Sequence, residues 1–153
     1  MPAPYKGGCQ CGAVRFEISA EPLTAYVCHC ITCQKQSGSA FGMAIVVPTD
    51  AIAVLEGGTS TFIKTADSGR ESDCVFCPKC GKRLVHHIKA DAAMSMVKTG
   101  LLDDASDIIP VAHLWTSRAL NWVTIPDNVL IFEGQPEVGM GSLIEAYKPT
   151  FPM

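Results

Sequence analysis

Gly8-Cys9-Gln10-Cys11-Gly12, near the start of the chain, and Cys77-Pro78-Lys79-Cys80-Gly81, near its middle, decide the fold. Each stretch holds two cysteines separated by one or two residues, beside glycines that tolerate tight turns, so both sulfurs can point to one spot. The two pairs together supply four soft ligands, the set of a closed zinc site. The sequence therefore predicts that Cys9, Cys11, Cys77 and Cys80 hold a structural zinc that ties distant parts of one sheet together.

A second cluster lies between these two pairs, in the segment Cys28-His29-Cys30-Ile31-Thr32-Cys33. It offers three thiolates and has no fourth cysteine nearby in the sequence, which predicts a second zinc with an open coordination position. Such a position binds a water or an external thiol and lowers its pKa. Because three thiolates donate charge to the metal, this zinc suits thiol activation better than carbonyl polarisation. We expect Cys28, Cys30 and Cys33 to hold a catalytic zinc and to carry the activity.

The eighth cysteine, Cys74, has two interpretations. It packs as a small apolar thiol beside Phe76, as free cysteines commonly do, or it is the fourth ligand of the middle zinc and closes that site. Disulfides are an alternative for all the cysteines. However, the two cysteines of a C-x-C pair are poor disulfide partners, and a core of this size needs no covalent cross-links. The chain begins without a basic and then apolar segment, which predicts no export signal and a cytoplasmic protein whose thiols stay reduced.

Length and composition favour one globular domain. The chain has 153 residues, of which 48% are hydrophobic and 18% charged, with no apolar run long enough to span a bilayer. The net charge of -3 argues against nucleic-acid binding, which relies on neutralising the phosphate groups with basic side chains. We therefore expect no nucleic acid and no membrane among the partners, and the sequence leaves the oligomeric state open.

Most segments have the pattern of strands, so the predicted fold class is mainly β. Val14, Phe16 and Ile18 alternate with polar residues, which is typical of a half-buried strand. The apolar run at 40–47 suits a strand buried on both faces. Further strands are expected, between turn residues, at 59–65, 83–88, 93–99, 111–116 and 122–125.

Helical patterns are few and short. Residues 32–37, followed by Gly38, and residues 141–147 have a suitable composition and length. The last stretch contains several prolines, so we expect a zinc-binding domain at 1–135 and a C-terminal extension at 136–153, which is either an appended segment or a tail that contacts a partner.

The chain resembles the family of glutathione-dependent formaldehyde-activating enzymes and centromere protein V over roughly residues 6–133. The motifs that carry the resemblance are Gly8-Cys9-Gln10-Cys11-Gly12, Cys28-His29-Cys30-x-x-Cys33, Ser37-Gly38, Phe76-Cys77-Pro78-x-Cys80-Gly81, and His113-Leu114-Trp115 with Ser117-Arg118 and Trp122. The resemblance implies an Mss4-like β fold, a structural zinc on the first and third cysteine motifs, and a catalytic zinc on the middle one. It also implies glutathione as the thiol, formaldehyde as the carbonyl substrate and S-hydroxymethylglutathione as the product.

The leading hypothesis is a zinc-dependent carbon–sulfur lyase similar to S-(hydroxymethyl)glutathione synthase, with two Zn²⁺ per chain and with a small thiol and an aldehyde as partners. The alternative is a non-catalytic zinc module that binds a protein or senses thiols, with Cys74 closing the middle site. His29 is a candidate general acid or base or a residue that orients a ligand. The alternative is an imidazole without catalytic duty, either on the surface or behind the metal ligands. His86, His87 and His113 are expected to include ordinary sheet histidines, and Trp115 and Trp122 to line the core or a pocket.

Overall fold

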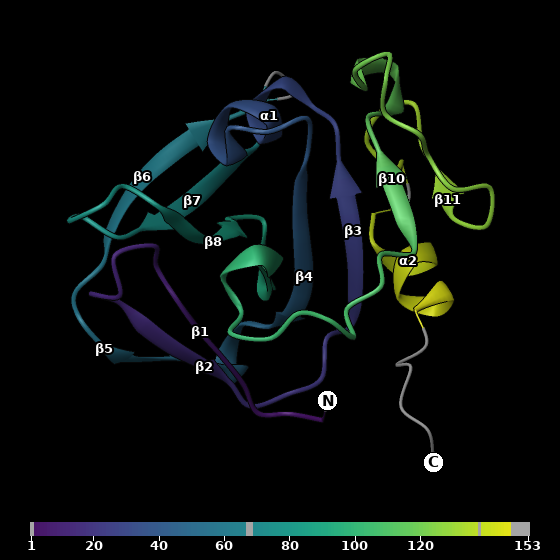
Figure 1. Cartoon of the computed structure of the whole chain (residues 1–153). Coiled ribbons are helices and arrows are strands. Elements are labelled where there is room, and N and C mark those ends of the chain that lie inside the picture. The colour runs from purple at the N-terminus through teal and green to yellow at the C-terminus, as the bar shows by residue number, and fades with distance from the viewer. Residues whose placement is uncertain (1, 67–68, 138, 148–153) are drawn as a thin grey trace.

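Two β-sheets and two short helices make up the protein, which we describe from a computed structural model covering residues 2–66, 69–137 and 139–147. The smaller sheet is antiparallel in the order β1-β2-β5. Its strands are β1 (Tyr5–Gly8), β2 (Arg15–Ile18) and β5 (Ile52–Glu56). In Figure 1 this sheet lies at the lower left, against the larger one.

The larger sheet has eight strands in the order β11-β10-β3-β4-β9-β8-β7-β6. All neighbours are antiparallel except β10, which runs parallel to both β3 and β11. The strands are β3 (Thr24–Cys28), β4 (Gly42–Pro48), β6 (Ser60–Thr65), β7 (Glu71–Phe76), β8 (Arg83–Ile88), β9 (Asp91–Lys98), β10 (Ala112–Leu114) and β11 (Leu130–Ile131).

Helix α1 (Ile31–Ser37) links β3 to β4, and helix α2 (Gly141–Ala146) lies beside β3. Three 3₁₀ turns, η1 (Thr49–Ala51), η2 (Thr99–Leu101) and η3 (Thr116–Arg118), complete the described elements. Figure 1 shows α1 at the upper end of β3 and β4, where the middle cysteine motif lies.

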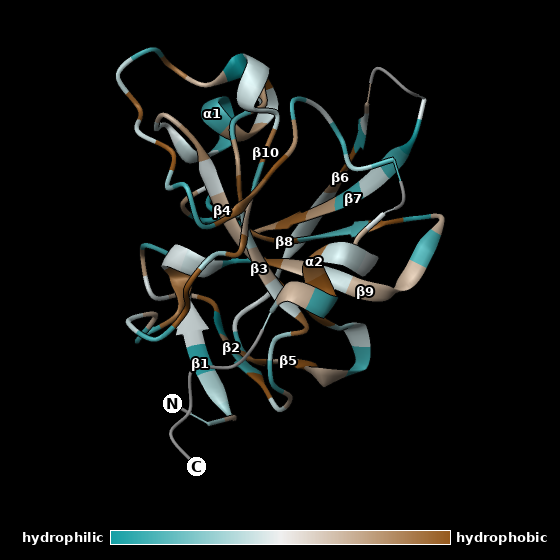
Figure 2. Cartoon of the chain, turned by 90° about the vertical axis from the view of Figure 1, so that its right-hand side faces the viewer, coloured by the Kyte–Doolittle hydropathy of each residue, from teal (hydrophilic) through white to brown (hydrophobic). Residues whose placement is uncertain are grey.

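Strand β4 separates the two parts of the hydrophobic core. Ile45 and Val47 pack into a cluster between the two sheets, while Ala44 and Val46 pack into a second cluster on the opposite face of the large sheet. Full burial of a valine or isoleucine side chain stabilises the fold by about 1.5–3 kcal/mol. Figure 2 shows hydrophobic segments where the strands meet at the centre and hydrophilic ones mainly in the outer loops. The continuous apolar run of β4 therefore reflects burial on both faces, as predicted.

The prediction of a mainly β fold with few short helices is confirmed, and most expected strands match β2, β4, β6, β8, β9 and β10. The strand expected at 122–125 is wrong, because Trp122 lies in a turn closed by the hydrogen bond from Val123 N–H to Leu120 O, and residues 123–125 have no regular structure. Trp122 was expected in the core or a pocket wall, which is also wrong, because its side chain is 74% exposed. The expected helix at 32–37 ends as predicted at Gly38, whose φ is 64°.

The C-terminal helix packs into the molecule. Leu143 of α2 is fully buried in the second cluster, and its carbonyl accepts a hydrogen bond from Thr24 Oγ1 at 2.9 Å. A division between residues 135 and 136 stays a prediction, and residues 148–153 of the expected extension lie outside the described residues. No helix in the described part of the chain is long and apolar enough to cross a membrane.

Candidate metal centres

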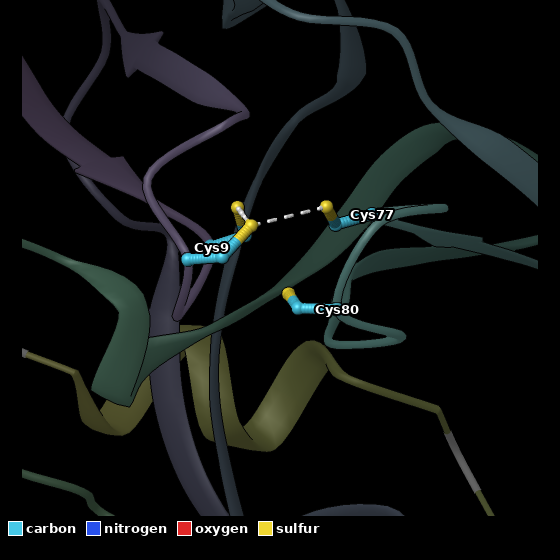
Figure 3. A group of neighbouring side chains, drawn as sticks. Cys9, Cys77 and Cys80 are labelled. Atoms are coloured by element: carbon cyan, nitrogen blue, oxygen red, sulfur yellow. Dashed lines mark hydrogen bonds between the residues drawn. The ribbon is translucent and has the colours of Figure 1, made fainter.

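The first and third cysteine motifs meet in space. The four sulfurs of Cys9, Cys11, Cys77 and Cys80 all lie within 4.8 Å of one another. Cys9 and Cys11 belong to the turn after β1, and Cys77 and Cys80 belong to the turn between β7 and β8. Figure 3 shows Cys77 and Cys80 projecting from one turn toward Cys9. The predicted grouping of these four residues is therefore present in the structure.

Local hydrogen bonds shape both turns. Gly12 N–H donates to Cys9 O at 3.0 Å, and Gly81 N–H donates to Cys77 O at 2.8 Å. Both glycines have a positive φ, 77° for Gly12 and 74° for Gly81, a conformation that costs other residues energy. Val14 N–H also donates to Cys9 Sγ at 3.2 Å, a bond that favours the thiolate. The glycines in these motifs are thus required by the turns that aim the sulfurs.

The spacing of these sulfurs fits a tetrahedral zinc. Cys9 Sγ and Cys11 Sγ are 3.5 Å apart, and Cys11 Sγ and Cys77 Sγ are 3.8 Å apart. Zinc–sulfur bonds of about 2.3 Å place tetrahedral sulfurs about 3.8 Å from one another. Burial raises the pKa of Cys9, but the hydrogen bonds from Val14, Cys11 and Cys77 outweigh it and lower the pKa to about 6. Cys9 therefore loses its proton readily. For Cys11 the hydrogen bond from Ala13 lowers the pKa, but burial and the neighbouring thiols outweigh it and raise the pKa to about 11, so a metal would displace that proton.

The middle motif forms a second group. The sulfurs of Cys28, Cys30 and Cys33 all lie within 4.8 Å of one another. Cys28 ends β3, Cys30 caps the first turn of α1, and Cys33 lies inside that helix. Cys30 Sγ accepts a hydrogen bond from Cys33 N–H at 3.3 Å, which both caps the helix and holds the sulfur toward its neighbours. The end of a strand and the start of a helix thus bring three ligands to one place.

Gly42, at the start of β4, makes room for this group. It lies opposite Cys28 in the β3–β4 pairing. A Cβ atom at Gly42 would lie 3.2 Å from Cys33 Cβ and 3.1 Å from Gln36 Nε2. Since α1 packs this closely on β4, the glycine fixes how near Cys33 approaches Cys28.

The three thiols of the middle group differ in how readily they lose their protons. Hydrogen bonds from Cys28 and Cys33 lower the pKa of Cys30, while the same contacts raise the pKa of Cys28. One thiolate therefore forms readily, and a divalent cation would displace the remaining two protons. The residues present fit a thiophilic metal such as zinc, with three protein ligands.

Cys74 is buried on β7 and does not belong to the three-sulfur group among the described residues. Its sulfur lies 3.8 Å from Ser72 O, and burial raises the pKa of its thiol. This placement agrees with the packed apolar thiol and not with a fourth ligand. All eight cysteines are free thiols in the structure, so no disulfide competes with the metal interpretation.

His29 and His113 form a buried pair. His29 Nε2 lies 2.9 Å from His113 Nδ1, and His29 is fully buried. The parallel pairing of β3 and β10 places His113 opposite Val27, which brings the two rings together although they are far apart in sequence. Burial lowers the pKa of both histidines. Because His29 is fully enclosed, the alternative of a surface imidazole is wrong, while a role in acid–base chemistry or in orienting a ligand stays a prediction.

Lys98 and His86 form a contact that no sequence motif predicted. Lys98 Nζ donates to His86 Nδ1 at 3.2 Å, and Lys98 is only 6% exposed. Burial and the charge of Lys98 hold the pKa of His86 well below its usual value, so the imidazole stays neutral and accepts this bond. In the sequence, Lys98 is only a single lysine at the end of an apolar strand pattern, and such a position does not by itself indicate a buried side chain.

Comparisons with known proteins agree with this geometry. A family model described as "Glutathione-dependent formaldehyde-activating enzyme" matches residues 4–118. Two curated relatives carry the name "Putative glutathione-dependent formaldehyde-activating enzyme". The relative from Penicillium rubens is 31% identical over 92 residues, which are 57% of this chain and 47% of that protein. The one from Halomonas elongata is 37% identical over 84 residues, or 52% and 53%. The chain thus spans about half the length of these relatives.

A solved structure of a Rhodobacter sphaeroides protein superposes with a TM-score of 0.50 at 20% identity, over 83% of this chain and 98% of that one. At this identity the likeness concerns the fold alone. The family model, in contrast, covers all three cysteine motifs and both sulfur groups. On this evidence the chain belongs to the glutathione-dependent formaldehyde-activating enzyme family.

Proposed function

We propose that the protein is a zinc-dependent carbon–sulfur lyase that combines glutathione, or another small thiol, with formaldehyde or a related aldehyde. The observation that carries the proposal is the incomplete ligand set of the middle group, in which three sulfurs converge and no fourth cysteine joins them among the described residues. Family membership supports the same chemistry. All eight thiols are free, which supports the cytoplasm as the proposed compartment.

Two zinc ions per chain are proposed, with different duties. Cys9, Cys11, Cys77 and Cys80 would hold the first as a closed, structural ion. Cys28, Cys30 and Cys33 would hold the second. When bound there, the metal supplies a Lewis-acid position that favours the thiolate form of a substrate thiol.

In the proposed reaction, the thiol sulfur donates an electron pair to the aldehyde carbon and a carbon–sulfur bond forms. The π electrons of the carbonyl move to its oxygen, which takes up the proton that the thiol has lost. The adduct contains all the atoms of the thiol and the aldehyde, and the reaction requires no oxidant. The reverse sequence cleaves the adduct into thiol and aldehyde.

The test is the exchange between glutathione and its formaldehyde adduct, measured by NMR with catalytic amounts of the zinc-loaded protein. Cys33→Ser should abolish the acceleration, because the middle group loses a soft ligand. The matched control is Cys74→Ser, which changes a cysteine outside that group and should retain both zinc ions and the exchange rate. A fully active Cys33→Ser variant would refute the mechanism. Loss of one zinc in Cys74→Ser would instead support the non-catalytic module.

A further inference from the structure

Lys98 is a buried cation. Its side chain lies in the interior, yet within the described ranges no aspartate or glutamate forms an ion pair with it. Its hydrogen-bond partner, His86, is a neutral acceptor. Burying an ammonium group costs several kcal/mol unless an anion compensates for the lost water. The cost of burying Lys98 therefore depends on which anionic groups lie on the same face of the sheet.

The strand register places Lys98 on the face that carries the three-cysteine group. Lys98 is paired with Ala44 on β4, and Ala44 is paired with Tyr26 on β3. One step further along the same face, Gly42 is paired with Cys28. Residues paired across strands point to the same side of a sheet, and so do residues two apart on one strand. Lys98 and Cys28 thus share a face.

Small residues occupy the strand between Lys98 and the cysteines. A Cβ at Gly42 would lie 3.2 Å from Cys33 Cβ, so the glycine leaves room for Cys33, and the small Ala44 is paired with Lys98. The electrostatics agree with this arrangement, because burial lowers the pKa of Lys98 whereas the thiolates of Cys33 and Cys28 oppose that effect. Cys74 adds to this effect and the charge of Arg83 acts against it, so the three-cysteine group supplies two of the three thiols whose charge raises the pKa of Lys98.

We propose that Lys98 is an electrostatic positioning residue that favours an anionic ligand, a thiolate, at the open position of the three-cysteine centre. The inference rests on the proposed function and names the charge of its substrate. Three thiolates around a divalent ion carry one net negative charge, and a thiolate ligand raises it to two. A nearby buried cation opposes that repulsion, while a neutral ligand gains little from it.

The experiment uses cobalt(II)-loaded protein, whose visible spectrum reports ligand binding without turnover. Glutathione and azide serve as anionic probes and imidazole as the neutral one, each titrated into wild type, Lys98→Met and Lys98→Arg. Lys98→Met should weaken glutathione and azide about tenfold or more and leave imidazole within about twofold. Lys98→Arg keeps the charge and should retain more of the anion affinity. Lys35→Met, which removes an exposed ammonium of α1 close to Cys33 in the chain, is the matched control and should behave as wild type.

The outcomes separate the two proposals. Equal anion affinities in wild type and Lys98→Met overturn the role of Lys98 and leave the lyase proposal standing. A wild type that binds azide but not glutathione overturns glutathione as the thiol substrate, and the azide titration still decides the role of Lys98. A wild type that binds none of the three probes has a closed site, which overturns both. A Lys98→Met variant that loses imidazole affinity as strongly as anion affinity shows a structural defect and also overturns the electrostatic role.

Discussion

Single residues at the middle group determine how closely its sulfurs approach. The three cysteines could be predicted from spacing, because Cys28, Cys30 and Cys33 are close in the chain. Gly42 could not be identified in this way, since its importance comes from the packing of α1 on β4. The same is true of the pair formed by His29 and His113, which depends on a parallel strand pairing between distant segments.

Gly42→Ala should weaken the middle metal site selectively. The added Cβ would lie 3.1–3.2 Å from Gln36 and Cys33, so α1 must shift by a few tenths of an ångström. Overpacking of this kind costs about 1–3 kcal/mol, and here the cost falls on a metal ligand. Dialysis against a chelator, followed by zinc analysis, should show faster loss of one zinc. Gly100→Ala is the control, because its Cβ would meet nothing within 4 Å. Equal zinc retention in both variants would contradict the role assigned to Gly42.

At the scale of elements, most strands with clear periodicity or long apolar runs were predicted, whereas β1, β3, β5, β7 and β11 were missed. β1 contains Gly7 and Gly8, residues that are depleted in strands. Gly7 is required there because a Cβ would lie 2.5 Å from Leu101 O. β3 ends in the cysteine motif and is buried along its whole length, so it lacks alternation. The segment 122–125, which was expected to be a strand, has a suitable composition but pairs with no neighbouring strand.

The turn after β5 offers a sharp test of backbone geometry. Gly57 has a φ of 77°, and a Cβ there would lie 2.1 Å from Ala13 O. Gly57→Ala should therefore lower the free energy of unfolding by about 2 kcal/mol or more, through both strain and overlap. The adjacent Gly58 has open space around its Cβ position, and Gly58→Ala should change stability by less than about 0.5 kcal/mol. Urea unfolding of both variants decides the matter, and a Gly57→Ala variant as stable as Gly58→Ala would contradict this description of the turn.

For the whole molecule, acid should destabilise the fold. Burial lowers the pKa of His29, His86 and His113 below the ordinary value of 6.5. Below pH 6.5 the unfolded chain therefore binds more protons than the folded protein, so the free energy of unfolding falls as the pH falls. Each histidine contributes at most about 1.4 kcal/mol per pH unit. Reprotonation of metal-binding thiols acts in the same direction.

Urea titrations of the zinc-loaded protein at several pH values between neutrality and mild acid would measure this effect. A His86→Gln variant separates the histidine contribution from metal loss, because it removes one titrating ring and leaves every cysteine in place. Its stability should fall less steeply with acid than that of wild type. Stability that does not change over this range, or an equally steep fall in His86→Gln, would contradict the assignment.

The two sulfur groups also differ in when they can exist during synthesis of the chain. The cysteines of the middle group emerge from the ribosome almost together, between residues 28 and 33, and need only the end of β3, helix α1 and the start of β4, where Gly42 lies. The other group joins Cys11 to Cys77 across 66 positions and requires the turn between β7 and β8 to be in place. Contacts of such separation form late and slowly. A nascent chain can therefore complete the proposed catalytic metal site before the proposed structural one.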